Sequence, residues 1–517
     1  MPKNVNIRPY NNKELLLFPA SIGDYLPKDD LAHVVDEAVD EIDLQPYYNK
    51  VSDVGNPPYH PALMIKIWFY GYATRTYSSR KIEEKLYKDV AFIYLAGMQK
   101  PDFKAISEFR RKNLSELKNS FIDILQICHR LGMTKLGEIP LDSKVIKANA
   151  SVSRTYDEKE LIKERETIEK AIREYLEKVN QTDLEEDQKY GPDKRGNEIP
   201  EDIRKKEDRI RKMRQVAKQL KQAQEKLKQR NKKRINLTDE DAQFQKDKSR
   251  IIPGYRAQVA VDSKEQVIVA NDVASEPTDP SQLVPMADEV IKNVKELKKT
   301  EQGLNKKDKI KLIADSSYNS GPNLAEIEKR KSIDPYIPDN KYQAKERGHK
   351  TDEDSPFHGS KFIFNKEENC FICPERRKVK FIKEIEHRGK PYLLYRCPDC
   401  KNCKYFGKCT TDKKGRSIRV SKYKHLICKM REKLSTKRAK ETYALRKITV
   451  EPVLGNLSQN LGFREFLLRG LYKVKGEFSL MCTAHNLLKI ARFVRQLGMS
   501  LKETLAMPEL SPVFDTS

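Results

Sequence analysis

Several features that would place this 517-residue chain in a common class are missing from its sequence. No apolar run reaches the roughly 18 residues that a membrane-spanning helix needs, and no apolar stretch follows the basic residues of the N-terminal MPKNVNIRPYNN, so no secretory signal is expected. No Gly-Lys-Ser/Thr phosphate loop or Rossmann glycine fingerprint occurs, which disfavours an ATP-driven or dinucleotide-dependent enzyme. The single tryptophan, Trp68, lies among Ile67, Phe69 and Tyr70 and is expected in a core. We therefore expect a cytoplasmic protein.

Acidic residues are scarce relative to basic ones. Lys and Arg number 101 against 76 Asp and Glu, a net charge of +25, which indicates a polyanionic partner and nucleic acid first. Residues 204–234 alone contain 15 basic and three acidic residues. Such a run suits an arm that follows a phosphate backbone, with Lys232, Lys233 and Arg234 at its end, although an ordinary solvated helix is the alternative.

The N-terminal quarter of the chain is predicted to be helical. Apolar residues recur at three- and four-residue spacing in 31–42, 60–75, 78–97 and 106–132. Basic residues at the ends of these helices, among them Arg110 and Arg111, could cross DNA backbones as helix-turn-helix units do, and a solvated face is the alternative.

From residue 137 the pattern changes to that of a mixed sheet with helices. Alternating or β-branched runs predict strands, and spaced apolar residues predict helices between them. A helical hairpin with two apolar seams and a polar, cysteine-bearing segment interrupt this sheet. The strands are predicted at 137–151, 254–263, 266–273, 309–315 and 333–338, and the helices at 280–297 and 321–330.

Three carboxylates lie at the edges of the predicted strands and helices. Asp142 lies in the first strand, Asp315 closes a later strand, and Glu451 is expected near the start of a C-terminal helix. A charge at the end of a buried strand costs free energy unless it is paired or binds a metal, although a lone Asp there is commonly a cap or turn residue. Three carboxylates can hold two divalent ions that cut and join phosphodiesters, with water or a 3′-hydroxyl as the nucleophile.

Six of the nine cysteines lie close together and are candidate zinc ligands, with free buried thiols as the alternative. Two C-x2-C pairs, 23 residues apart, have the spacing of a zinc ribbon. The six are Cys370, Cys373, Cys397, Cys400, Cys403 and Cys409.

The sequence resembles bacterial insertion-sequence transposases of the DDE type, in the branch that pairs an InsH-like N-terminal domain with a ribonuclease H-like catalytic domain. Several segments are similar to those of the family and occur in the same order. The N-terminal resemblance rests on HPALMIKIWFYGYATRTYSSRKIEEKLYKDVAFIYLAG and PDFKAISEFRR. The catalytic resemblance rests on LDSKVIKANAS, GYRAQVAVDSKEQVIVANDV, IADSSYNSG, VEPVLGN and GFREFLLRGLYKVKGEFSLMCTAHNL.

The resemblance implies that Asp142, Asp315 and Glu451 are the catalytic acids and hold Mg²⁺ or Mn²⁺. It also implies DNA contacts by residues that precede the glutamate, namely Tyr443, Arg446 and Lys447. The family's lysine seven positions after the glutamate is replaced by Ser458, and Leu454 stands where an aromatic residue is common. Either Lys473 or Lys475 takes over that contact, or this copy is defective.

The sequence thus predicts an α+β protein that binds the terminal inverted repeats of an insertion sequence, as a dimer on double-stranded DNA, and cleaves and transfers strands. A catalytically silent DNA-binding descendant and a two-metal nuclease without transposition are the alternatives, and a coiled-coil and zinc-ribbon scaffold would lack the acids. The predicted parts are a helical DNA-binding domain (1–135), a ribonuclease H-like domain (136–339 and 441–495), a hairpin insertion (156–235), a Cys-rich insertion (340–440) and a tail (496–517).

Overall fold

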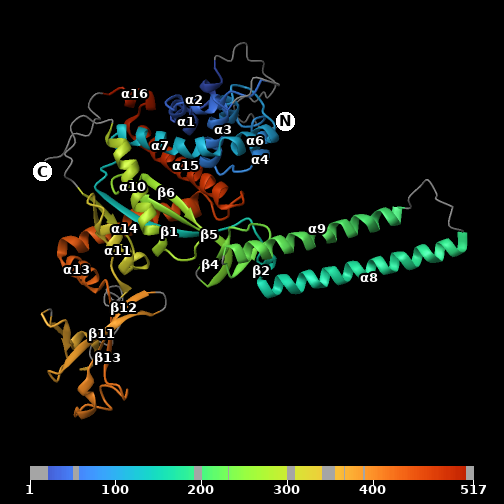
Figure 1. Ribbon diagram of the computed structural model, residues 1–517. Coiled ribbons are helices and arrows are strands. Elements are labelled where there is room, and N and C mark those ends of the chain that lie inside the picture. The colour runs from blue at the N-terminus through green and yellow to red at the C-terminus, as the bar shows by residue number, and fades with distance from the viewer. Residues whose placement is uncertain are drawn as a thin grey trace, which may run out of the picture. The chain divides into compact units, whose positions relative to one another are not determined.

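The computed structural model describes residues 21–50, 57–190, 201–230, 232–247, 249–299, 309–340, 356–365, 367–387 and 390–507. The chain divides into two compact units, Met1–Met133 with Leu480–Ser517, and Thr134–Ser479 (Figure 1). The second boundary lies inside α15 (Leu471–Leu497).

The first unit is helical, as its apolar spacing predicted. Its core includes α3, whose Trp68 is fully buried. Two of the predicted helices are each divided in two. Asp89 ends the first half of 78–97 because its carboxylate accepts hydrogen bonds from the backbone of Ala91 and Phe92 at the start of the next helix. The elements are η1 (Ile22–Tyr25), α1 (Leu31–Asp40), α2 (Gln45–Tyr48), α3 (Pro61–Ala73), α4 (Ser79–Lys85), α5 (Val90–Leu95), α6 (Phe103–Lys112), α7 (Leu114–Arg130) and α16 (Leu501–Leu505).

The second unit is built on a six-stranded mixed sheet, which confirms the predicted α+β class. The strand order is β4-β5-β1-β7-β8, and β6 also pairs with β5. β5 is antiparallel to β1 and β6, whereas β7 is parallel to β1 and to β8. The strands are β1 (Glu138–Lys147), β4 (Gln243–Asp247), β5 (Arg250–Val261), β6 (Ile268–Ala274), β7 (Ile310–Ile313) and β8 (Ile333–Tyr336).

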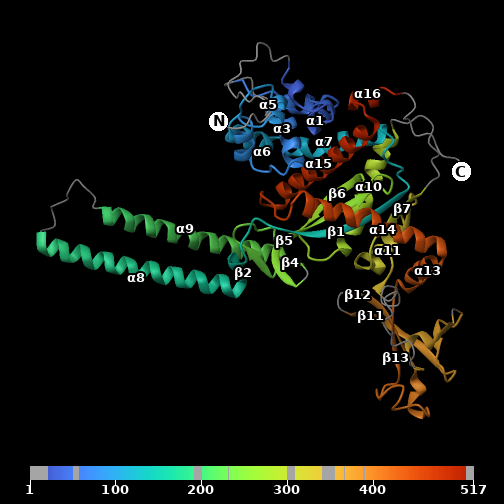
Figure 2. The same ribbon diagram turned by 180° about the vertical axis from the view of Figure 1, so that it is seen from behind.

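Helices pack on this sheet from both neighbouring and distant parts of the sequence (Figures 1 and 2). α10 packs on β6 and β5, and α14 packs on β1, β5, β7 and β8. The later helix therefore brings residues after 436 onto the strands that carry the first two predicted acids. The helices are η3 (Pro280–Gln282), α10 (Leu283–Lys298), η4 (Ser316–Tyr318), α11 (Gly321–Glu328), α13 (Lys424–Ser435), α14 (Lys437–Gly455) and a π-helical turn (Asn456–Asn460).

The hairpin insertion consists of α8 (Glu158–Tyr190) and α9 (Glu201–Gln229), preceded by η2 (Val152–Arg154) and closed by the antiparallel pair β2 (Thr155–Asp157) and β3 (Arg234–Asn236). The first helix includes residues 181–190, whose polar composition is typical of a loop. At the closed end its two helices share a small apolar core of Leu161, Leu220, Ala223, Leu227 and Ile235.

The polar, cysteine-bearing segment contains a five-stranded antiparallel sheet in the order β13-β12-β11-β10-β9. Its core is formed by Phe362, Phe371, Val379 and Tyr395 with two of the cysteines. The sequence concealed these strands because the sheet has only this small core and lysines are frequent along β11. The strands are β9 (Ile363–Asn365), β10 (Cys370–Ile372), β11 (Lys378–His387), β12 (Lys390–Arg396) and β13 (Ser417–Ser421), with η6 (Gly359–Lys361) and η7 (Pro398–Asn402).

Candidate active site

The register of two parallel strands brings the two predicted aspartates to one level of the sheet. β1 pairs with β7 so that Pro140 lies opposite Ile313. Asp142 follows the first of these residues by two positions, and Asp315 follows the second by two. Since parallel strands end at the same edge, the two carboxylates are neighbours there, and the charge of Asp315 acts on the carboxyl group of Asp142.

Glu451 reaches the same region from α14. It lies near the end of that helix, not near its start as the sequence indicated, because the helix begins at Lys437, ahead of the TYALRKITV segment. The link is Arg446, one turn earlier on the helix. Its Nη1 lies 2.6 Å from Asp142 Oδ2, and its Nη2 lies 2.8 Å from Glu451 Oε1. A guanidinium with 14% side-chain exposure therefore bridges the first and third predicted acids.

The carboxyl group of Asp142 is difficult to ionise. Burial raises its pKa to about 6, and the charges of Asp315 and Asp279 act in the same direction. Arg446 and a hydrogen bond from the backbone N–H of Ser143 oppose this rise. Asp142, Asp315 and Glu451 together carry more negative charge than Arg446 alone balances, a condition that favours a further cation.

Arg446 also bears on metal binding. Among the residues that the structure describes, no group of three or more acidic, Cys or His side chains is arranged to hold a metal ion. The guanidinium lies between Asp142 and Glu451 and supplies positive charge to both. The acids thus have the chemistry of a divalent-cation site, in an arrangement in which an arginine stands in for the cation.

Asp315 has a local structural role as well. Its Oδ1 accepts a hydrogen bond of 2.8 Å from the backbone N–H of Ser317 and so caps η4, as the alternative interpretation of a strand-end aspartate expected. Its other oxygen, Oδ2, takes no part in this cap. Capping and cation binding are therefore compatible at this residue.

The position of Ser458 is approached by a lysine from elsewhere in the chain. Lys144, two residues after Asp142 on β1, places its Nζ 2.5 Å from Ser458 Oγ and 3.5 Å from the carbonyl oxygen of Leu454. Lys475, one of the two replacements considered from the sequence, forms an ion pair of 2.8 Å with Asp272. Lys473, the other, is exposed.

The predicted DNA contacts fall into different environments. Arg110 was expected on a DNA-binding surface, but the residue is buried, with 7% exposure. Its guanidinium lies over the Trp68 ring at 4.2 Å and donates to the hydroxyl of Tyr72. Arg111, next to it, is exposed and pairs with Glu108. The other contacts are exposed at Lys447, Lys233 and Arg234, and half-buried at Tyr443 and Lys232.

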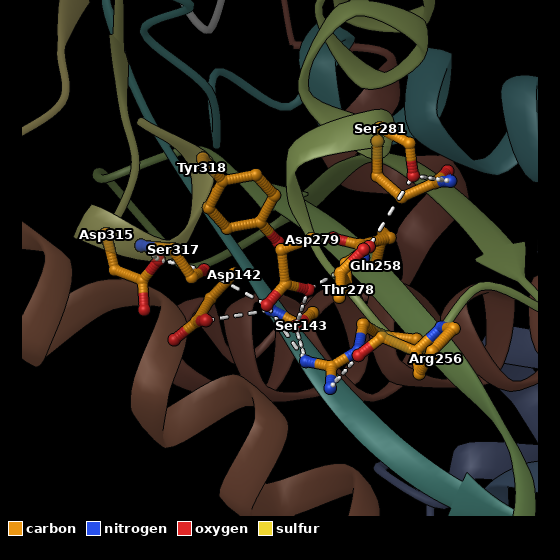
Figure 3. Close-up of polar contacts among 12 residues, drawn as sticks. Asp142, Ser143, Arg256, Gln258, Thr278, Asp279, Ser281, Asp315, Ser317 and Tyr318 are labelled. Carbon is orange, nitrogen blue, oxygen red and sulfur yellow. Dashed lines mark hydrogen bonds and ion pairs between the residues drawn. The ribbon is translucent and has the colours of Figure 1, made fainter. Parts of the chain in front are cut away.

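Four polar side chains of this region were missed from the sequence. Asp279, Ser143, Ser317 and Arg256 form a hydrogen-bonded group beside the two aspartates (Figure 3). Asp279 stands between Thr and Pro, a context typical of a turn, so nothing local marked it. The clue that could have been used is the double carboxylate-serine pattern, Asp142-Ser143 and Asp315-Ser316-Ser317.

The cysteines of the small sheet divide into a group of five and one separate residue. Five of them line one cavity together with Phe357, Phe362 and Tyr405. Cys370 does not line it, and its Sγ lies 3.6 Å from Glu368 Oε2. Burial raises the pKa of the Cys397 thiol to about 12, and Cys400 beside it adds to the rise. The five cavity-lining residues are Cys373, Cys397, Cys400, Cys403 and Cys409.

Two segments of the chain match family models of transposases. Residues 372–491 match a transposase DDE domain, and residues 20–112 match a transposase domain, DUF772. The first match contains Glu451 and the five cavity-lining cysteines, but neither aspartate. A search of curated proteins and a search of solved structures gave no match.

Over these two segments the chain is similar to transposases, and the matches support that class. The matches support the resemblance to insertion-sequence transposases of the DDE type, whereas the InsH-like branch stays a prediction. No helix in the described part of the chain is long and apolar enough to cross a membrane.

Proposed function

We propose that this transposase binds the terminal inverted repeats of its element and carries out metal-dependent DNA cleavage and strand transfer at the Asp142, Asp315 and Glu451 site. The observation that carries the proposal is the convergence of these three acids. The β1–β7 register supports the neighbourhood of the aspartates, and Arg446 joins Asp142 to Glu451. The strand order is consistent with a ribonuclease H-like core.

Asp142, Asp315 and Glu451 would hold Mg²⁺ or Mn²⁺, which when bound makes water a stronger nucleophile and stabilises charge on a phosphodiester. The chain itself supplies the shape and the charge of the site. Asp142 lies on β1, Asp315 follows β7, and Glu451 approaches on a helix packed against these strands. Arg446 has to leave at least one of its carboxylates before that carboxylate can bind a second cation, and it would then be available to a DNA phosphate.

DNA contacts are proposed on two surfaces besides the acids. Lys447 is exposed on α14 one residue after Arg446, and Tyr443 lies one turn earlier. Lys144, whose ammonium reaches Ser458, is proposed to supply the positive charge that the family places at that sequence position. In this proposal Lys144 takes the place of the lysine that the family has at position 458, so the serine found there does not by itself make the protein inactive.

The helical hairpin is proposed as an arm that follows the phosphate backbone. Its second helix contains most of the basic run, and Lys233 and Arg234 are exposed where the hairpin closes. A dimer on DNA would hold two element ends together. The thiol cavity is proposed as a structural zinc site formed from its five cysteines.

The proposal is tested by incubating the full-length protein with a labelled element end in Mg²⁺, beside Asp315→Ala. Metal-dependent cleavage that is lost in the variant supports it. Binding without cleavage by the unaltered protein supports the silent DNA-binding alternative. Cleavage without joining of the released end to a target supports the nuclease.

A further inference from the structure

A fourth carboxylate, Asp279, lies in the acid region and is not used by the proposed function. It precedes η3 in the connection from β6 to α10 and is 7% exposed. Its side chain makes no capping hydrogen bond to η3, although it stands at the cap position. Figure 3 shows its carboxylate directed toward Ser143 and Ser317, so the residue serves the acid region and not its own turn.

Asp279 has a hydrogen-bond partner on each oxygen. Its Oδ1 accepts from the Ser143 hydroxyl at 2.6 Å, and its Oδ2 accepts from Arg256 Nη1 at 2.9 Å and from the Ser317 hydroxyl at 3.0 Å. Arg256 is itself largely buried, with 16% of its side chain exposed, and its Nη2 donates to the carbonyl oxygen of Pro277. A buried ion pair with this many partners is a fixed point of the structure.

Each serine connects Asp279 to one of the predicted metal-binding aspartates. Ser143 donates its backbone N–H to Asp142 at 2.8 Å while its hydroxyl bonds to Asp279. Ser317 donates its backbone N–H to Asp315 at 2.8 Å, and its hydroxyl oxygen lies 2.5 Å from the same carboxylate and 3.0 Å from Asp279. The chain of contacts runs Asp142, Ser143, Asp279, Ser317, Asp315 without a gap.

The Ser317 hydroxyl has one proton and lies between two carboxylates, so it can donate to only one of them at a time. When a cation neutralises Asp315, the proton is free to turn to Asp279, which keeps a partner in both states. Asp279 can therefore tolerate a change at Asp315 without losing its place between the two strands.

We infer that Asp279 is a positioning residue, which through Ser143 and Ser317 holds Asp142 and Asp315 at the spacing that a divalent cation requires. The inference rests on the proposed function for the identity of the cation. Partners of this kind, one bond removed from a metal ligand, change metal affinity or activity by about 10- to 100-fold when they are altered.

The test titrates full-length protein with Mn²⁺ alone and counts free Mn²⁺ by electron paramagnetic resonance. Asp279→Asn and Ser317→Ala are each expected to weaken Mn²⁺ binding about tenfold or more. Asp288→Asn is the matched control, because Asp288 also pairs with an arginine, Arg330 at 2.6 Å, but lies on the exposed side of α10. Its Mn²⁺ affinity should stay within about twofold of the unaltered protein, the range of a surface change.

A double variant, Asp279→Asn with Ser317→Ala, is expected to weaken Mn²⁺ binding by less than the product of the two single effects, because the two changes share the contact between Ser317 and Asp279. Thermal unfolding identifies a variant that fails to fold, and Ser143→Ala then replaces it. Unchanged Mn²⁺ affinity in folded variants overturns the inference, as does absence of Mn²⁺ binding by the unaltered protein. If the variants weaken Mn²⁺ binding but the unaltered protein does not cut an element end, the positioning role stands and the proposed function fails.

Discussion

The carboxylate site and the thiol cavity are two clusters of chemically active side chains that the same chain builds in opposite ways. The cysteines are close together in sequence, from 370 to 409, and yet one of them lies outside the cavity. The acids are separated by more than 300 residues, and yet one arginine touches two of them. Closeness in sequence is therefore a weaker guide to a shared site than strand register, which fixes position to within a residue.

The two clusters also differ in the groups that surround their side chains. The acids are held by charged and hydrogen-bonded partners, Arg446 on one side and Asp279 with its serines on the other. The thiols are surrounded by aromatic rings, and burial raises the pKa of Cys397 so that it stays protonated near neutral pH. A metal at the first site has to compete with a cation, whereas a metal at the second has to displace protons.

The largest effect is expected where the carboxylate site loses an acid. Glu451→Gln keeps the shape of the side chain but removes its charge, and we expect cleavage of an element end to fall about a thousandfold, the scale of several kcal/mol of lost charge stabilisation. Single-turnover cleavage in Mg²⁺ measures it. Asp334→Asn is the control, since that aspartate lies in the neighbouring strand β8 and pairs with Lys433. A similar loss of cleavage in both variants would show that Glu451 has no specific role in cleavage.

Zinc binding separates the two clusters directly. Cys400→Ser is expected to weaken zinc binding by at least about 100-fold, because a hydroxyl replaces a thiolate ligand, whereas Cys370→Ser should keep about one zinc per chain. Inductively coupled plasma mass spectrometry of purified protein measures the content. Equal loss from the two variants would place Cys370 among the ligands, and zinc-free unaltered protein would refute the structural zinc site.

The large sheet shows which features of the fold could be predicted from the sequence. All five predicted strands of the large sheet are present, because their β-branched alternation reflects burial within one sheet. Asp142 lies within its predicted strand and Asp315 just after its own, whereas their catalytic role came from the resemblance and stays a prediction. Strand β4, with the sequence QFQKD, was missed because its polar residues do not have that alternation.

The remaining parts of the site depend on contacts that no local pattern records. Asp279 resembles a turn residue. Arg446 was assigned to DNA by the resemblance, and no local pattern indicates its pairing with Asp142, 304 positions away. Arg110 was assigned to a surface because a basic residue is normally exposed, whereas here the aromatic ring of Trp68 covers its charge. In each case the structure adds a tertiary contact that the sequence does not indicate.

Moving the lysine from position 144 to position 458 tests whether the location of its charge in the structure matters more than its position in the sequence. Lys144→Ser should weaken binding to an element end about tenfold and lower the salt dependence by about one ion, as loss of one phosphate contact does. Adding Ser458→Lys, which restores the family's sequence position, should recover most of the binding. Salt-dependent binding isotherms measure both effects. Failure of the second change to restore binding, with Lys144→Ser alone impaired, would show that the two positions are not equivalent.

The smallest effect is expected at Arg446, the charged partner that distinguishes the carboxylate site from the thiol cavity with its aromatic lining. Arg446→Ala removes the cation that bridges Asp142 and Glu451, so Mn²⁺ should bind about three- to tenfold more tightly in the absence of DNA, as removal of a competing ligand requires. Titration followed by electron paramagnetic resonance measures it, and Arg438→Ala, an exposed change on the same helix, is the control. Cleavage at saturating Mn²⁺ should fall at the same time if Arg446 turns to a DNA phosphate. Weaker Mn²⁺ binding in Arg446→Ala would mean instead that the guanidinium holds the acids in the geometry that the metal needs, and that cation and arginine act together at this site.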